Sequence, residues 1–228
     1  ASDKEQALAD KIRVQSLSTT YSLLRDKSIN NDEKFELYIR LGQTHLERHD
    51  FLKHIEMKAY EKKFDAYEKK KRKLIAKGYH AQAKKLKEPK LIQVGSKGEL
   101  SKAVKALKIA VKKYPNERRL DLALYTLGQT KLLLGEEDGY KYLSRLIRKF
   151  PKSVIFPDAN LALAEYYFEN NKHSKAIPHY AVLMKYKNHK GYLYAVYKLA
   201  WSNYNISFEH MNKQKHLKKA LIGFKIVI

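Results

Sequence analysis

The chain has 228 residues, a net charge of +23 and no cysteine. The lack of cysteine excludes a disulfide framework, a thiolate nucleophile and a cysteine-based zinc site. Gly and Pro are few, and no apolar run approaches the roughly 18 residues that a membrane span needs. We therefore expect an all-helical chain that is long enough to bury a core.

The N-terminal part is predicted to hold one helix over residues 1–34, followed by a helical hairpin. The hairpin reads FELYIRLGQTHLERHDFLKHIEMKAYEKK, and its turn is expected at RHDF. With the loop that follows, this first unit covers residues 35–98. The chain begins at Ala1 rather than Met and stops inside an apolar helical pattern, so we expect a processed or truncated product.

A long basic helix is predicted over residues 51–77, which contain neither Pro nor Gly. A helix of that length would extend for about 40 Å, and Gly78 is expected to end it. Four apolar side chains share one face of this helix: Tyr60, Phe64, Tyr67 and Leu74.

Two interpretations of this segment stay open. In the first, its apolar face packs on the repeats while the lysines face water. In the second, it is a polyanion-binding arm, because residues 51–113 carry a net charge of +14, against −1 for 1–50 and +10 for 114–228. Nucleic acid is the less favoured partner, because no base-reading motif accompanies the charge. The predicted basic patch comprises Lys69, Lys70, Lys71, Arg72, Lys73, Lys77, Lys84, Lys85 and Lys87.

A further helix is predicted over residues 99–114, with Pro115 as its stop. Its partner helix is left open, and the segment 79–87 is the candidate.

The segment GSKGELS at 95–101 contains two glycines and a serine but lacks the order of a phosphate-binding loop. We interpret it as the start of that helix, with Ser96 or Gly98 as the cap and Glu99 in the first turn.

The second half of the chain repeats with a period of 36 residues. Three pairs of a leucine with a small residue share this step: Leu127-Gly128, Leu163-Ala164 and Leu199-Ala200. The tetrapeptide LGQT occurs at 41–44 and again at 127–130, 86 residues apart. Because that spacing exceeds two periods by 14 residues, it indicates an insertion between the two copies.

Each unit reads L-[GA]-x2-Y and, after a polar turn, A-x3-[FY], as at Ala176 and Tyr180. This pattern resembles the tetratricopeptide repeat, in which a small residue lets two helices cross closely and an aromatic ring fills the space beside it. The resemblance implies a right-handed α-solenoid of such helix-turn-helix repeats over residues 99–228, with a long basic helical insertion before it. In the last unit, extra residues within SFEHMNKQKH precede Ala220 and Phe224.

The segments FPDANLALAEYYFENNKHSKAI and YAVYKLAWSNYN occur in that order after the charged segment EMKAYEKKFDAYEKKK. This arrangement resembles periplasmic repeat proteins of bacterial gliding-motility and cell-envelope machines. The resemblance implies a periplasmic or envelope-associated scaffold that binds proteins and catalyses nothing. An acidic protein partner would suit the charge, a cytoplasmic location is the alternative, and self-association through the last helix is a further hypothesis.

Stacked helix pairs leave a groove lined by their first helices, where peptides bind. Large rigid aromatic side chains suit the anchoring of such a partner. The alternative for Trp201 is packing against the next repeat. The register of the repeats predicts these groove residues: Tyr125, Gln129, Leu132, Glu165, Phe168, Tyr194, Tyr197, Trp201 and Tyr204.

His45 and His49 lie four residues apart in HLERH, a spacing that suits a metal ion, but the zincin order is absent and no third ligand is identified. We interpret both as ordinary histidines of a helix surface. The acidic run at 136–138 is expected to begin a helix, where carboxylates favour the dipole. The sequence thus predicts no catalytic, metal or cofactor site, and not an enzyme.

Overall fold

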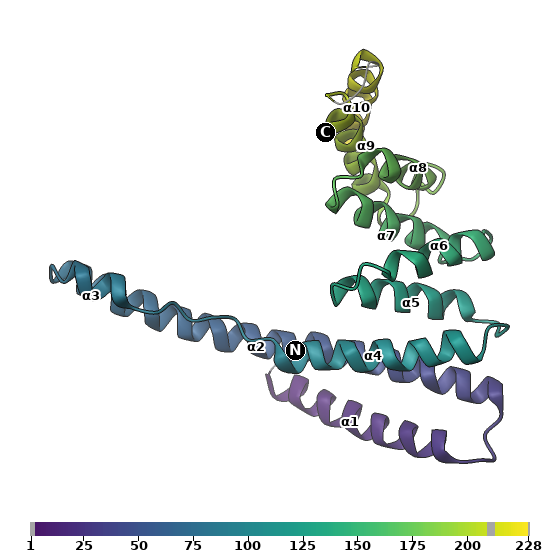
Figure 1. The fold of residues 1–228 in the computed structure, drawn as a ribbon, viewed down its shortest axis with the longest axis horizontal. Helices are drawn as coiled ribbons and strands as arrows, with labels where there is room; N and C mark the ends of the chain where they lie inside the picture. Colours follow the sequence, from purple (N-terminus) through teal and green to yellow (C-terminus); the bar gives the residue numbers. More distant parts are fainter. Residues whose placement is uncertain (1–2, 209–212, 228) are drawn as a thin grey trace. The chain divides into compact units, whose positions relative to one another are not determined.

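The computed structural model describes residues 3–208 and 213–227, and within these ranges the chain forms ten helices and no strand (Figure 1). The predicted all-α fold is confirmed. The chain divides into two compact units, Ala1–Ala106 and Leu107–Ile228. Among the described residues, no helix combines the length and the apolar character that crossing a membrane requires. The helices are α1 (Asp3–Arg25), α2 (Asn31–Ala76), α3 (His80–Lys85), α4 (Val94–Lys113), α5 (Leu120–Leu133), α6 (Gly139–Lys149), α7 (Phe156–Glu169), α8 (His173–Leu183), α9 (Tyr192–Ile206) and α10 (Lys213–Val227).

Helix α2 is continuous over 46 residues, so the turn expected at RHDF is wrong. The helix begins with a capping box, in which the side chain of Asn30 accepts a hydrogen bond from the Glu33 amide and Glu33 accepts one from the Asn30 amide. It ends as predicted beside Gly78, whose φ is 77°. The Tyr79 amide donates to the carbonyl of Leu74 across this end. Between the two caps, RHDF contains no Gly or Pro that would break a helix.

The partner of α4 in the first unit is the N-terminal half of α2. Leu41 of α2 and Ala106 of α4 share a buried cluster with Leu17 of α1. The candidate partner at 79–87 is wrong, because that segment forms α3, which packs on α2. Helices α2 and α4 are therefore a pair with residues 77–93 and the second half of α2 inserted between them, in agreement with the long spacing of the two LGQT segments.

The start of α4 is capped from α2. One carboxylate oxygen of Glu56 accepts hydrogen bonds from the amides of Gly95 (2.9 Å) and Ser96 (3.1 Å), and the other accepts one from the Ser96 hydroxyl (2.5 Å). The predicted capping by Ser96 or Gly98 is therefore wrong, because an acidic side chain 40 residues away satisfies these amides.

His45 and His49 are buried, with 2% and 5% of their surface exposed, so their interpretation as surface histidines is wrong. His49 Nδ1 lies 2.9 Å from the carbonyl oxygen of Ser96. His45 lies between the Tyr21 hydroxyl, 3.0 Å from Nε2, and Glu99, 2.6 Å from Nδ1. In the described part of the chain, no three His, Cys, Asp or Glu residues are grouped so that they could hold a metal ion.

The 36-residue period sets the helix starts in the second unit. Helices α5, α7 and α9 begin at Leu120, Phe156 and Tyr192, each 36 residues after the last. Gly135 and Asn171 lie in the turns after α5 and α7 with φ of 85° and 55°. Their positive φ values close each helix in the same way, so the local turn chemistry repeats with the period.

Helices α5 and α6 cross at Gly128 and Gly139, as the small residue at Gly128 predicted. A Cβ placed on Gly139 would lie 2.6 Å from the carbonyl oxygen of Gly128. At the equivalent crossing of α9 and α10, a Cβ on Gly223 would lie 2.8 Å from the Cβ of Ala200. The extra residues predicted within SFEHMNKQKH lie partly outside the described ranges, which omit 209–212.

The second half of α2, α3 and the returning segment 86–93 form a basic arm (Figure 1). Tyr60, Phe64 and Tyr67 are partly buried on α2, and their neighbouring rings lie 5.8 and 6.0 Å apart. Ala83 of α3 is buried. Helix α3 therefore packs on α2, the helix that carries these three aromatic rings.

Candidate functional site

Two of the predicted groove residues, Glu165 of α7 and Tyr194 of α9, are in direct contact. The Tyr194 hydroxyl donates a hydrogen bond to Glu165 Oε2 at 2.6 Å, and the Tyr180 hydroxyl donates one to Oε1. Lys198 Nζ lies 3.8 Å from Oε2. Burial raises the pKa of Tyr194 and that of Tyr180, and the charge of Glu165 adds to both effects. Glu165 thus joins α7, α8 and α9, and its charge is partly balanced by Lys198.

Lys198 also contacts two aromatic rings of this face. Its ammonium lies 4.1 Å from the ring centre of Phe168 and 5.4 Å from that of Tyr194. Such cation–π contacts fix a long side chain in place. Lys198 was absent from the predicted site, although its spacing of four residues from Tyr194 places it on the same helix face.

Helix α9 presents an aromatic stripe, which we call the α9 stripe. Its rings contact one another in edge-to-face geometry, from Tyr197 to Trp201 and on to Tyr204, at 5.5–6.2 Å between neighbouring centres. All of its members keep between 36% and 63% of their surface exposed. Spacings of three and four residues place the four members within α9 along one side of the helix over about 15 Å, and Phe208 follows just after the helix ends at Ile206. The α9 stripe comprises Tyr194, Tyr197, Trp201, Tyr204 and Phe208.

Phe224 of α10 holds the centre of the α9 stripe in place. Its ring centre lies 5.3 Å from that of Trp201 and 6.1 Å from that of Tyr197. Both interpretations of Trp201 therefore have a basis, because the indole contacts Phe224 of α10 while 36% of the residue stays exposed. Phe224 was not predicted as part of this site, since α9 and α10 meet only in the fold. Phe208 was missed too, although its spacing of four residues from Tyr204 continues the row.

The three predicted groove residues of α5 differ in exposure. Gln129 is exposed. Tyr125 and Leu132 are partly buried against the cluster around Leu143, and burial raises the pKa of Tyr125 to about 12. Leu132 also lies at the crossing with Gly139. Tyr125 and Leu132 therefore contribute mainly to the core, whereas Gln129 is exposed and forms a side-chain hydrogen bond with Tyr125.

The predicted basic patch lies on the arm of the first unit. Eight of its nine side chains are exposed. Lys71 is partly buried, and its Nζ lies 3.9 Å from Glu68 Oε1. Arg72 lies 3.7 Å from the same carboxylate. The other seven members form no ion pair within the described ranges. The arm therefore presents a dense positive surface.

Comparison with known families gives one match. Residues 122–153, which hold α5 from its third residue, α6 and the turn beyond, match the family described as Tetratricopeptide repeat. No curated protein matches the chain, and no solved structure does. The match and the all-helical fold support a tetratricopeptide-repeat protein, and such a repeat indicates a scaffold for protein–protein interaction.

Proposed function

We propose that the chain is a non-enzymatic tetratricopeptide-repeat scaffold that binds a protein partner through the α9 stripe. The observation that carries the proposal is a row of four aromatic side chains on α9, continued by Phe208 just beyond its end, all of which stay at least 36% exposed. Four of the rings, from Tyr197 to Phe208, already contact one another in sequence, and Tyr194 is held by Glu165, so a partner that covers them orders few additional rotamers.

Three further predicted groove residues extend this binding surface onto the neighbouring helices. Phe168 and Glu165 of α7 are joined to the stripe through Lys198 and Tyr194. Gln129 of α5 adds an exposed amide. A partner that lies along α9 would therefore meet rings first and polar groups at the edge, an arrangement typical of binding hot spots.

The test is site-specific photo-crosslinking in cells that express the full chain. A photoreactive phenylalanine analogue at Tyr204 should give a discrete adduct, whereas the same analogue at Tyr79, an exposed tyrosine of the arm, should not. Replacement of Trp201 by Ala should weaken binding of the identified partner by about 30-fold. Tyr79→Ala is the matched control. If Trp201→Ala and Tyr197→Ala bind the partner as the original chain does, the binding face is assigned wrongly.

The cellular setting that we propose is a bacterial envelope or motility assembly, with the chain in the periplasm. The proposal rests on the resemblance of the segments around FPDANLALAEYY and YKLAWSNYN to periplasmic repeat proteins. Fractionation of the native host tests it. The chain should appear with periplasmic marker proteins, and recovery with cytoplasmic markers alone would contradict the proposal.

A second function, polyanion binding, is favoured by the exposed basic patch of the arm. Neutralised phosphates or sulfates release counterions, so affinity should fall steeply between low and physiological salt. Titration with polyuridylate and with dextran sulfate measures this dependence. Lys69→Ala/Lys70→Ala/Lys73→Ala should flatten it, whereas three substitutions at Lys213, Lys218 and Lys219 of α10 should not. A salt-independent affinity would contradict this function.

A further inference from the structure

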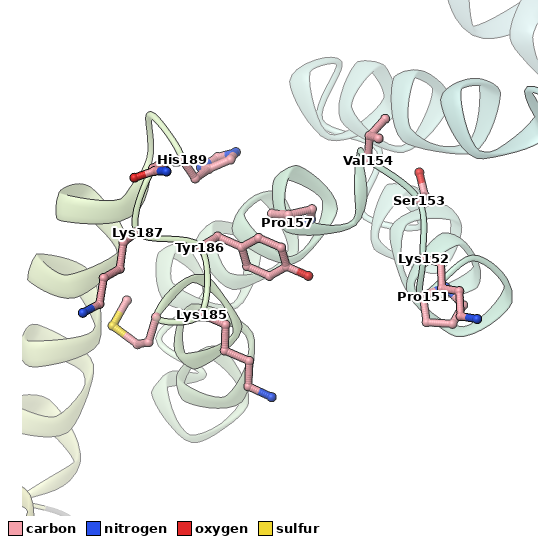
Figure 2. Close-up of a pocket in the computed structure, with 11 residues that line it drawn as sticks. Pro151, Lys152, Ser153, Val154, Pro157, Lys185, Tyr186, Lys187 and His189 are labelled. Atoms are coloured by element: carbon pink, nitrogen blue, oxygen red, sulfur yellow. The ribbon is translucent and has the colours of Figure 1, made fainter.

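A pocket of about 1050 Å³ lies in the second unit between two turns that join successive repeats. One turn follows α6 and contains Lys152 and Val154, and the other follows α8 and contains Lys185, Tyr186 and Lys187. Figure 2 shows the two turns on either side, with the ring of Tyr186 extending between them. We call this site the turn pocket.

The turn pocket has an apolar floor. Pro157, near the first turn of α7, is buried beneath it. The ring of Tyr186 is 38% exposed, and Val154 is 89% exposed on the opposite turn. A valine so fully exposed gains nothing from the fold, and it is one of the residues that line the pocket (Figure 2).

The rim of the turn pocket is positively charged. Lys152, Lys185 and Lys187 are exposed, and none of them forms an ion pair with another described residue. Two carboxylates beside the pocket contact lining residues other than the lysines: Asp158 lies 3.2 Å from Nε2 of His189, and Asp121 accepts a hydrogen bond from the Ser153 hydroxyl at 2.5 Å. The three ammonium groups are therefore not neutralised from within this part of the fold.

Helix stability does not account for these lysines. Cations favour the last turn of a helix, where they offset its dipole, and Lys113 and Lys149 at the ends of α4 and α6 fit that explanation. Lys152 and Lys187 lie beyond the helix ends, in the turns themselves. Lysine at these positions is better explained by a ligand than by the helices.

We propose that the turn pocket binds a segment of acidic protein chain that carries an apolar side chain. The apolar side chain would cover Pro157, Tyr186 and Val154, and carboxylates before and after it would pair with Lys152 on one side and with Lys185 and Lys187 on the other. The pocket is large enough for several residues of a peptide. A nucleic acid is disfavoured, because its evenly spaced phosphates would lie over the apolar floor as well as over the two charged edges.

The inference is independent of the proposed function, because the α9 stripe does not line the turn pocket. It adds a second contact surface, which a scaffold could use for another part of the same partner. A fault in one assignment leaves the other standing: Trp201→Ala should weaken binding at the stripe and leave binding at the turn pocket unchanged.

The experiment uses the full chain and a synthetic peptide of Asp and Glu residues with one central photoreactive leucine. Fluorescence anisotropy at physiological salt should show that Lys185→Ala/Lys187→Ala binds the peptide about fivefold more weakly. The control variant Lys218→Ala/Lys219→Ala, which removes the same charge from α10, should change the affinity for the peptide less than about twofold. Equal losses in the two variants would mean that only net charge matters, and would overturn the proposal.

The apolar contact is tested by comparing two peptides, one with a central leucine and one with a central glycine, on a variant of Val154. Val154→Asn should weaken binding of the leucine peptide and leave binding of the matched glycine peptide unchanged. Leu221→Asn, at an exposed aliphatic residue elsewhere, is the control and should change neither. Photo-crosslinks of the leucine should map to residues 151–157 and 184–189. Crosslinks confined to the arm or to the α9 stripe, or displacement of the peptide by polyuridylate more readily than by an acidic peptide, would overturn the proposal.

Discussion

His45 Nδ1 of α2 lies 2.6 Å from Glu99 Oε2 of α4, and both side chains are almost fully buried. The two residues are 54 positions apart because the whole arm lies between them. Arg48 and Lys102 also contact Glu99, at 3.2 and 2.9 Å. The junction of α2 and α4 is therefore a charged network rather than an apolar seam alone, and its stability should depend on pH.

Acid should weaken the first unit through His45. Burial lowers the pKa of His45 below 6.5 despite the opposing effect of Glu99. As the pH falls below 6.5, the unfolded chain binds a proton that the folded chain does not, so stability is lost. Hydrogen exchange of α4 should quicken between pH 7 and pH 5.5 relative to the intrinsic rate. The variant His45→Gln should lose this pH dependence, and His54→Gln, at an exposed site on α2, should keep it.

A second acid transition should follow from Glu99. Burial alone would raise its pKa, but hydrogen bonds from Lys102 and His45 and the charge of Arg48 lower it below 4.5. Stability contributed by this carboxylate is present above pH 4.5 and is lost as the pH falls through the folded-state value. In Glu99→Gln the same exchange measurement should show a smaller loss below pH 4.5. The loss that remains should come from Glu56, since burial alone would raise its pKa but hydrogen bonds from Ser96 and Gly95 lower it. A loss as large as in the original chain would contradict this assignment.

Gly139→Ala should destabilise the second unit by about 2 kcal/mol or more, because the new Cβ would overlap the backbone of α5. It would lie 2.6 Å from the carbonyl oxygen of Gly128, which cannot move without its helix. Thermal unfolding, followed by the fluorescence of the single Trp201, measures the change. Gly98→Ala, where nothing lies within 4 Å of the new Cβ, is the control and should be neutral or slightly stabilising.

Gly78→Ala should destabilise the arm by about 1 to 2 kcal/mol, because φ of 77° at this residue is a conformation that L side chains disfavour. Hydrogen exchange of residues 73–85 should quicken. Gly78→Asn should be milder, since asparagine already adopts a positive φ at Asn171. Equal exchange in the alanine variant and the original chain would show that this turn does not limit the stability of the arm.

Alkaline pH should weaken the second unit through Tyr125. Burial raises its pKa to about 12, so between pH 10 and pH 12 the unfolded chain releases a proton that the folded chain keeps. The urea midpoint should therefore fall with rising pH in this range, and the fall should be smaller in Tyr125→Phe. Tyr79→Phe, at an exposed position, is the control. An unchanged slope in Tyr125→Phe would contradict the attribution.

The repeats of the second unit were predictable because their signals are local. Gly135 and Asn171 close the first helices, and the small residues at Gly128 and Ala200 mark the crossings within reach of a single unit. The pairing of α2 with α4 was not predictable in this way. No local pattern indicates that a helix pairs with another helix that follows a long insertion. The repeat pattern predicts that the partner comes directly after a turn at RHDF, but RHDF contains no residue that breaks a helix, and α2 continues through it.

The candidate site was predictable to a similar extent. Four members of the α9 stripe follow from the register of α9 alone, since they share one face of one helix. Lys198 lies on that face too, but its contact with Phe168 depends on how α7 and α9 pack. The turn pocket was not predicted at all, because the turns that contain Val154 and Lys187 approach each other only in the folded unit.

The unbroken course of α2 has a mechanical consequence. One helix of 46 residues, about 69 Å long, forms both the first helix of a repeat and the shaft of the arm. A force that a partner applies at the tip of the arm would be transmitted along α2 to its base, where Glu56 and His49 connect the helix to α4. Tension or torque on the arm would first strain the hydrogen bonds of this junction, so residues 94–99 would be displaced before any other part of α4.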